Sequence, residues 1–340
     1  MSTRIPLLFG TPGFGAASAA GSVAARINTV KDAQDVVNLF TSYGHKGIDT
    51  SRCYGNGSSE EFIGQLDLHG GYVDTGYGVN FPLGDTASRS YPSTPGEFAP
   101  EKLRESVRLS VEALGKHKIH TFFLHAPDRS IPIEDTLRTI NELYKEGNFE
   151  EFGVSNYNSW EVAEIVAITK ENNWIKPTVY QGLYNAVERR IEVELLPCLR
   201  HFGIRYDAYS PLASGLLTGK FLSDADMQSA KGTRWDPNAS QFASALQEKY
   251  SVLIPLVREL AEVLKKYDIR VSEAAQRWLQ HHSELKPELG DAIIIGASSI
   301  TQLEANLKDC MGGPLPEEVL NVLNRAWEKA RGVAPHYTFI

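Results

Sequence analysis

Short hydrophobic and β-branched runs along the chain alternate with longer segments whose apolar residues recur every three to four positions. The runs expected to form strands are 5–10, 47–51, 72–76, 119–125, 151–156, 178–185, 205–211 and 292–297. The segments expected to form helices are 30–43, 58–67, 100–114, 132–146, 159–172, 192–202, 272–282 and 300–309. This alternation is typical of βα units and a parallel sheet.

The number of these units favours a closed barrel. Eight βα units in about 300 residues fit a (β/α)8 TIM barrel better than an open doubly wound sheet. We therefore expect an α/β fold with one domain over 1–340, and a further helix at 316–331 followed by the tail VAPHYTFI. Two long connections, 77–99 and 212–250, interrupt the pattern. Connections of this length are usually lids or binding loops.

Composition narrows the class of protein. The 340 residues are 42% hydrophobic and 22% charged, which is enough to bury a large core. A net charge of −8 argues against nucleic acid or an anionic membrane as partner, because both require clustered Lys and Arg. Cys53, Cys198 and Cys310 lack metal-ligand spacing and fit a reducing compartment. With no signal peptide or long apolar run, we expect a cytoplasmic protein, and a homodimer stays open.

Polar residues end the apolar strands. In a barrel of this kind the active site lies at the carboxyl ends of the strands, so these residues are the candidates for chemistry. The strand-end residues to consider are Asp49, Thr50, Ser51, Thr75, Gly76, His125, Ser155, Asn156, Gln181, Tyr209, Ser210 and Gly296 to Ser299.

An ordered series of motifs accompanies these strand ends. It comprises GIDTSRCYG (47–55), FFLHAPD (122–128), GVSNY (153–157), AYSPLASGLLTGK (208–220) and IIIGASSITQLEAN (293–306). In this order the sequence resembles the aldo-keto reductases, and among them the branch that contains the aflatoxin-aldehyde reductases. The resemblance runs from about residue 5 to the tail. Each motif alone is weakly specific, whereas the ordered series is strongly specific.

The resemblance implies a reaction and three catalytic residues. In this family NADPH delivers a hydride to a carbonyl carbon while a tyrosine hydroxyl donates a proton to the carbonyl oxygen. Tyr54 is then the general acid, Asp49 an anion behind it, and His125 orients the carbonyl through a hydrogen bond to its oxygen. The implied substrate is a small carbonyl compound.

One catalytic residue that the resemblance implies, a lysine, is missing. A phenol has a pKa of about 10 and donates reluctantly at neutral pH unless a buried ammonium lowers that pKa. The resemblance places this lysine at the end of the third strand, where the sequence has Gly76, and no lysine occurs between Lys46 and Lys102. The nearest cations are Arg52 and Arg89, and an arginine does not relay protons. We therefore expect weakened acid catalysis.

The resemblance also implies a cofactor site. Its members would hold the nicotinamide, wrap the pyrophosphate, and place a 2′-phosphate at the amino end of the last barrel helix, which favours NADPH and NADP over NADH. The implied residues are Ser155, Asn156, Gln181, Tyr209, Ser210, Leu212, Gly215, Lys220, Arg234, Ala297, Ser298, Ser299, Gln302 and Asn306.

Simpler interpretations stay open beside these. Asp49 also fits a structural strand-end carboxylate, His125 and Tyr209 fit core positions, and Ser298 and Ser299 fit a helix N-cap. We expect no metal site.

Two further functions also stay open. One is a redox-neutral isomerase, dehydratase or cyclase of specialised metabolism that uses Tyr54 and His125, with Gly76 opening space. The other is a non-catalytic NADPH-binding regulatory subunit. For a reductase, the tail lacks the arginine of the related branch, which favours a larger, apolar carbonyl substrate.

Overall fold

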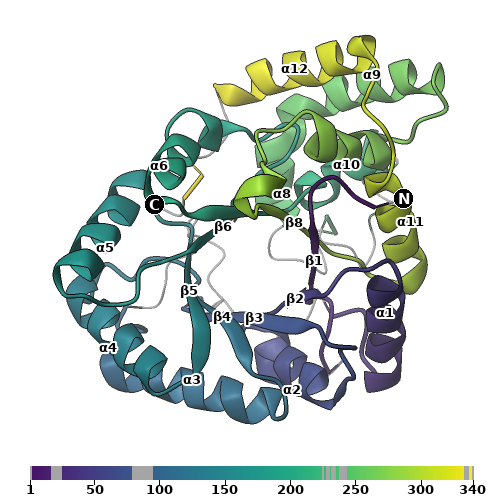
Figure 1. Cartoon of the computed structure of the whole chain (residues 1–340). Coiled ribbons are helices and arrows are strands. Elements are labelled where there is room, and N and C mark those ends of the chain that lie inside the picture. Colours follow the sequence, from purple (N-terminus) through teal and green to yellow (C-terminus); the bar gives the residue numbers. More distant parts are fainter. Residues whose placement is uncertain are drawn as a thin grey trace.

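The computed structural model describes residues 2–16, 25–78, 95–223, 226, 230, 235–236, 243–332 and 337–338. Within these residues, eight parallel strands pair in sequence order and close into a barrel, because β1 also pairs with β8. Figure 1 shows the strands around the centre with the helices outside. The strands are β1 (Leu7–Gly10), β2 (Gly47–Asp49), β3 (Tyr72–Tyr77), β4 (Ile119–Leu124), β5 (Phe149–Ser155), β6 (Val179–Leu183), β7 (Arg205–Tyr209) and β8 (Ala292–Ile295).

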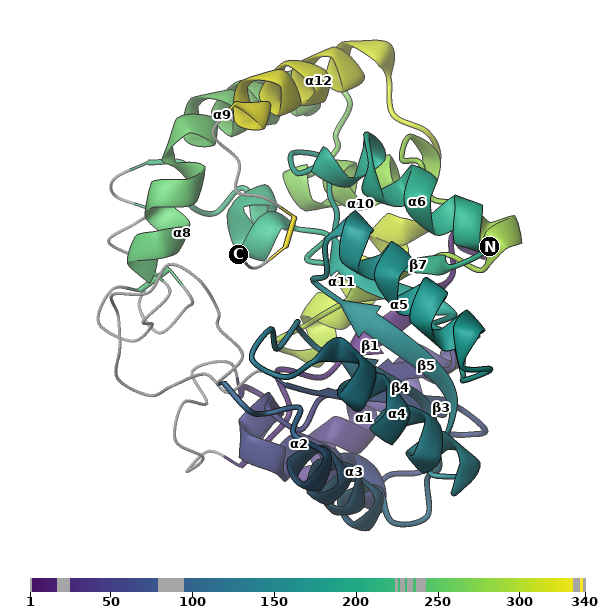
Figure 2. The ribbon, with the colours of Figure 1, turned by 90° about the vertical axis from the view of Figure 1, so that its left-hand side faces the viewer.

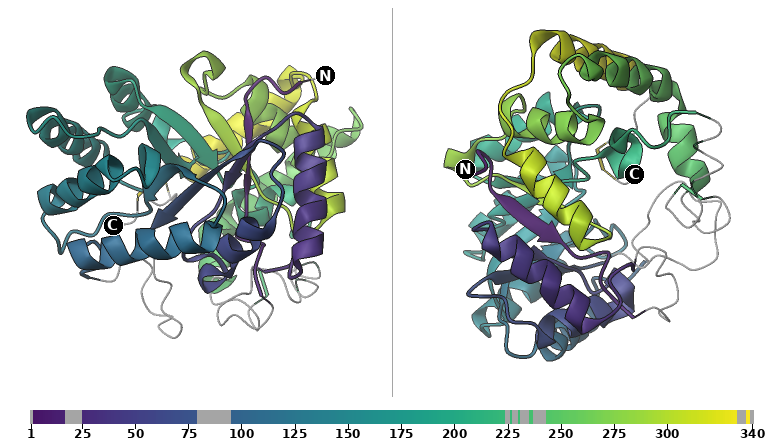
Figure 3. Two further views of the ribbon diagram at one scale, coloured as in Figure 1. Left: turned by 60° about the horizontal axis from the view of Figure 1, so that its bottom comes forward. Right: turned by 90° about the vertical axis from the view of Figure 1, so that its right-hand side faces the viewer.

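The barrel helices follow the strands. They are α1 (Val30–Ser42), α2 (Ser58–Gln65), α3 (Pro100–Leu114), α4 (Ile133–Lys145), α5 (Ser159–Glu171), α6 (Leu195–Phe202), α10 (Val271–His281) and α11 (Ile300–Cys310). In α1 the side chain of Thr29 caps the first turn, and Ala33, Val36, Val37 and Phe40 form the buried face. The first and last βα units meet where the barrel closes, and there β1 lies between α1 and α11 (Figure 3).

Further helices lie beside the barrel. They are α8 (Ala243–Tyr250), α9 (Ile254–Lys265) and α12 (Glu317–Arg331). Helices α9 and α12 pack side by side along one edge of the molecule (Figure 2). Short 3-10 helices are η1 (Tyr54–Gly57), η2 (Arg190–Glu192), η3 (Ala213–Thr218), η4 (Ser251–Leu253) and η5 (Pro287–Leu289). No described helix combines the length and apolarity needed to cross a bilayer.

The predicted (β/α)8 barrel is confirmed, although several predicted strands are shorter in the structure and α9 was not predicted. Strand β2 ends at Asp49 instead of residue 51, because the chain turns where the Tyr54 amide donates to the Ser51 carbonyl. The connection 212–250 contains η3 and α8, which the pattern did not predict. Residues 79–94, within the other long connection, lie outside the described part of the chain.

The strand register places polar side chains inside the barrel. Asp49 pairs in register with Asp74, and Gln181 pairs with Asp207. All four side chains are buried. Since alternate side chains of a strand face the same side, the barrel interior carries a polar cluster as well as an apolar one. The apolar cluster consists of Leu8, Ala292 and Ile294, with Tyr209 packed against it.

Candidate active site

The three predicted catalytic residues lie where β2 and β4 end. Asp49 is the last residue of β2, Tyr54 is the first residue of η1, and His125 follows β4 directly. The rings of Tyr54 and His125 meet edge to face, with their centroids 6.2 Å apart and their planes at 87°. The phenol of Tyr54 and the imidazole of His125, which are distant in the sequence, therefore lie next to each other at the barrel mouth.

Asp49 is held by an amide side chain. Gln181 Nε2 donates a 2.7 Å hydrogen bond to Asp49 Oδ1. Burial raises the pKa of Asp49 well above its usual value, and the nearby carboxylates of Asp74 and Asp207 raise it further, whereas the Gln181 hydrogen bond lowers it. The acid form of Asp49 is therefore the form that this environment favours.

Asp207 adds a second buried carboxyl group that the sequence interpretation did not single out. Burial raises the pKa of Asp207 to about 8, and its Oδ1 accepts no hydrogen bond from the described residues. The nearby cation, Arg205, is engaged in a 2.6 Å ion pair with Glu151. The signal that could have found Asp207 is its inward position beside Gln181 in the neighbouring strand.

Gly76 occupies the place expected for the lysine. It lies in β3 in register with Phe123 of β4. A Cβ atom added to Gly76 would be 3.0 Å from Phe123 Cβ and 3.1 Å from the Phe123 carbonyl oxygen. A side chain at this position therefore requires a small movement of Phe123, and the space is tighter than the sequence alone suggests.

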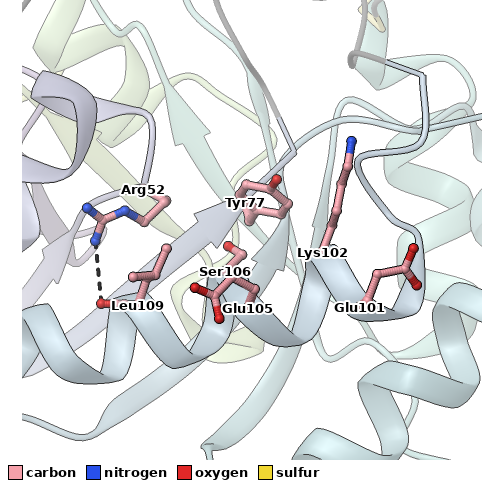
Figure 4. A pocket seen from close by; sticks show the side chains of 7 residues that line it. All are labelled: Arg52, Tyr77, Glu101, Lys102, Glu105, Ser106 and Leu109. Carbon is pink, nitrogen blue, oxygen red and sulfur yellow. Dashed lines mark hydrogen bonds between the residues drawn. The ribbon is translucent and has the colours of Figure 1, made fainter.

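Arg52 does not take over the position of that lysine. Its guanidinium forms a 2.5 Å ion pair with Glu60, which is fully buried and also accepts a 2.7 Å hydrogen bond from Thr75 Oγ1. It also donates to the carbonyl of Leu109, on α3. Figure 4 shows Arg52 beside Tyr77 at a cleft of about 230 Å³ that residues of α3 line. The guanidinium of Arg52 therefore lies between the barrel and its helices, where Glu60 neutralises its charge.

Part of the predicted nicotinamide set forms one hydrogen-bond network. Tyr209 Oη donates to Asn156 Oδ1 at 2.8 Å. Asn156 Nδ2 lies 2.9 Å from both Ser155 Oγ and the carbonyl oxygen of His125, and donates to both. Asn156 adopts a left-handed backbone, with φ of +64°, which turns its side chain back across the strand ends. The network joins β4, β5 and β7.

The predicted pyrophosphate segment begins after β7. Ser210 has a φ of +56°, and its carbonyl accepts a 3.0 Å hydrogen bond from Asn185 Nδ2. Leu212 caps η3, and its carbonyl accepts a hydrogen bond from the Gly215 amide. Lys220, just beyond η3, is exposed. Arg234 lies outside the described residues.

The predicted 2′-phosphate residues lie at the start of α11. Ser299 is the N-cap and accepts a 3.2 Å hydrogen bond from the Gln302 amide. The amide and hydroxyl of Ser298 both donate to Gln302 Oε1, and Asn306 Nδ2 donates to the Gly296 carbonyl. Ala297 is half-buried. The N-cap interpretation of Ser299 is correct, and it leaves the hydroxyl of Ser298 at the positive end of the helix.

Two residues near the catalytic pair were missed in the sequence. Ser51 was noted as a strand-end polar residue without a role, and Cys53 was read only as an isolated thiol. The Ser51 hydroxyl lies 3.1 Å from His125 Nδ1 and 3.2 Å from Cys53 Sγ. No local sequence pattern predicts these contacts, because they depend on how the chain turns after β2.

Comparison with known proteins gives consistent relatives. A family model described as Aldo/keto reductase family matches residues 6–328. Aflatoxin B1 aldehyde reductase member 2 of Mus musculus is 41% identical over 305 residues, which cover 88% of this chain and 81% of that protein. Aldo-keto reductase pigE of Monascus ruber is 36% identical over 345 residues, which cover 98% of both chains. Oxidoreductase sirO of Leptosphaeria maculans is 35% identical over 334 residues, covering 98% of this chain and 96% of that protein.

Proposed function

Because the chain belongs to the aldo/keto reductase family, we propose that it reduces an aldehyde or ketone with NADPH and that Tyr54 is the general acid. The chain is an oxidoreductase of the aldo/keto reductase type. Members of this family act on small carbonyl substrates and generally use NADH or NADPH. The choice of NADPH, the roles of individual residues and the nature of the substrate are the proposed part.

One observation carries the proposal: the Asn156 amide donates to the backbone carbonyl of His125. It connects the phenol–imidazole pair to the strand ends that present Ser155 and Tyr209. This set of groups fits a nicotinamide, because hydroxyl and amide groups match its carboxamide and a tyrosine ring offers it a flat face. When bound, the cofactor supplies a hydride.

The amino end of α11 supports NADPH over NADH. Ser298 and Ser299 bring two hydroxyl groups and the positive end of the helix dipole to one place. Lys220 would add positive charge along the pyrophosphate. These features suit a cofactor with an additional phosphate.

The proposed acid step is a slow one. A positioned general acid contributes about 10²–10⁴-fold to a rate, and a phenol without a neighbouring ammonium delivers only part of this factor. Gly76 supplies no charge, and Arg52 is paired with Glu60. We therefore expect a low kcat for carbonyl reduction.

The tail supports a larger, apolar substrate. Tyr337 Oη accepts a 3.2 Å hydrogen bond from the Ser159 amide, and Thr338 Oγ1 donates to Asn158 Oδ1. This places part of the tail against the segment that follows Asn156, close to the proposed site. Residues 333–340 include no arginine that could pair with an acidic substrate.

NADPH titration is the direct test. We expect NADPH to quench the tryptophan fluorescence and to raise the melting temperature, and an aliphatic or aromatic aldehyde to increase NADPH consumption with stoichiometric alcohol formation. An absence of binding at high-micromolar NADPH would refute the proposed function. Binding without aldehyde-dependent turnover would favour the redox-neutral alternative.

The redox-neutral alternative has an observation of its own. Burial lowers the pKa of His125 to about 4, so that the ring is neutral and only weakly basic at physiological pH. An isomerase, dehydratase or cyclase that works through this neutral ring and the hydroxyl of Tyr54 does not need the missing ammonium. Product analysis without net NADPH consumption would identify it.

A further inference from the structure

A buried carboxylate away from the catalytic residues joins two distant parts of the chain. Glu188 lies in the turn after β6 and is 6% exposed. Its Oε2 accepts hydrogen bonds from Asn185 Nδ2 at 2.7 Å and from Tyr250 Oη at 2.9 Å, and its Oε1 forms an ion pair with Lys249. Lys249 and Tyr250 are the last two residues of α8. Glu188 therefore connects the turn after β6 to the carboxyl end of this helix.

One set of contacts leads from Glu188 through Asn185 to the segment that follows β7. Asn185 Nδ2 has two hydrogens, of which one goes to Glu188 and the other to the Ser210 carbonyl at 3.0 Å. Asn185 Oδ1 accepts a 3.0 Å hydrogen bond from the Val187 amide. A flipped amide would turn a donor toward the Val187 amide and an acceptor toward two oxygen atoms, so only one orientation fits. Glu188 thereby fixes the side chain that holds Ser210.

A second set of contacts leads from Glu188 through Tyr250 to the same segment. The rings of Tyr250 and Trp235 are buried and stacked, with their centroids 6.0 Å apart and their planes at 28°. Trp235 Nε1 donates a 3.0 Å hydrogen bond to the Ser214 carbonyl. The two sets of contacts therefore hold both ends of the segment 210–214, and both begin at Glu188.

The backbone between these two ends requires such support. Ser210, Ala213 and Ser214 have φ angles of +56°, +48° and +54°, in the left-handed region that side chains disfavour. Residues in sparsely populated backbone regions keep their conformation only where the surrounding structure holds them. Removing a contact at either end should therefore allow the segment 210–214 to leave its present conformation.

We propose that Glu188 is a positioning residue for the cofactor: it holds the segment 210–214 in the conformation that receives the pyrophosphate, and its loss weakens NADPH binding without changing the chemical step. A backbone that is already in place binds more tightly, because less conformational freedom is lost on binding. The role in cofactor binding rests on the proposed function, whereas the support of the segment in the free protein does not.

Hydrogen exchange, followed by NMR in the free protein, tests this support. The amides of Ala213 and Gly215 donate to carbonyl oxygens within the segment 210–214, at 3.0 and 2.9 Å. We expect both amides to exchange at least about 10-fold faster in Glu188→Ala, which removes hydrogen bonds to a charged group. Tyr250→Phe removes one hydrogen bond and should accelerate the exchange roughly 5-fold. This milder variant also tests the proposal if Glu188→Ala does not fold.

Tyr184→Phe is the matched control. Tyr184 is also buried, and its hydroxyl donates a 2.6 Å hydrogen bond to a different glutamate, Glu192 of η2. The same atom is removed from a similar pair, but that pair is not part of the two sets of contacts that begin at Glu188. The exchange of the Ala213 and Gly215 amides should stay as in the natural protein.

Calorimetric titration with NADPH supplies the second readout. The dissociation constant should rise at least about 10-fold in Glu188→Ala and roughly 5-fold in Tyr250→Phe, while kcat at saturating NADPH stays the same. The double variant should bind no more weakly than Glu188→Ala, because both changes remove the same contact.

The outcomes separate the parts of the proposal. Unchanged exchange in Glu188→Ala and Tyr250→Phe, or an equal acceleration in Tyr184→Phe, would overturn the support of the segment. Faster exchange with an unchanged dissociation constant, or a fall in kcat at saturating NADPH, would overturn the role in cofactor positioning. A natural protein that does not bind NADPH, with the exchange as expected in the variants, would refute the proposed function and leave the structural role of Glu188 intact.

Discussion

Replacing Gly76 with lysine tests whether the site lacks only a positive charge. The side chain would enter the barrel from β3, next to β2, whose last residue is Asp49. Its Cβ would lie 3.0 Å from Phe123 Cβ, so that Phe123 must shift by a few tenths of an ångström. Overpacking of this kind costs about 1–3 kcal/mol of folding free energy. The barrel should still fold.

The electrostatic gain should exceed this cost at the site itself. An ammonium about 4 Å from a carboxylate or phenolate gains roughly 4 kcal/mol at an effective dielectric constant near 20. This equals about 3 pKa units, which counteracts the effect of burial on Asp49 and lowers the pKa of Tyr54. Because a general acid is worth about 10²–10⁴-fold, we expect Gly76→Lys to raise kcat/KM for carbonyl reduction at least about 10-fold.

The assay follows NADPH consumption with an aldehyde across a pH range. Gly76→Met is the matched control, since it has a similar length and no charge, and Gly76→Ala measures the cost of contact with Phe123 alone. A rate for Gly76→Lys that does not exceed the rate for Gly76→Met would refute the electrostatic reasoning. Reductase activity in Gly76→Lys alone would show that the natural protein is not a reductase.

Three further predictions concern other parts of the barrel. Tyr54→Phe should lower carbonyl reduction at least about 100-fold while NADPH still binds, and equal rates would remove Tyr54 as the acid. Burial raises the pKa of Asp207 in the folded state from an ordinary value of 3.8 to about 8, so its stabilising contribution is complete below about pH 4 and lost as pH rises through 8. In urea denaturation Asp207→Asn should therefore match the natural protein at pH 4 and be the more stable at pH 8, and a pH-independent difference would contradict this. Asp291 is fully buried and paired with Arg200, so Asp291→Ala should lower the free energy of unfolding by about 3–5 kcal/mol. In the same denaturation experiment, Glu134→Gln at an exposed ion pair should change it by less than about 1 kcal/mol.

The barrel could be predicted because each βα unit carries its own local signal. Strand runs and amphipathic segments such as α1 need no information from the rest of the chain. Helix α8 lies within the connection 212–250, which is rich in Gly, Ser and Asp, and α9 follows it directly; both were harder to predict because the βα alternation stops there. Their position depends on packing against other elements, as for α9 against α12.

Candidate site residues could be proposed from the sequence, but their contacts could not. The ordered motifs identified Tyr54 and His125, whose rings the structure places side by side, and Asp49, the last residue of β2. The carboxyl group of Asp207 was missed, because its nearness to Gln181 follows from strand register, which barrel closure determines. The direction of Arg52 was equally hidden, since it depends on the buried Glu60.

These contacts lead to one conclusion about charge in the site. With no ammonium at position 76 and with Arg205 paired with Glu151, the anionic form of Asp49 is costly, and burial favours its acid form. His125 is neutral for the same reason. The environment therefore favours the uncharged forms of Asp49 and His125, and both residues offer hydrogen-bonding groups to the site. Such groups select a ligand by the placement of hydrogen-bond donors and acceptors, which suits the larger, apolar carbonyl substrate proposed above.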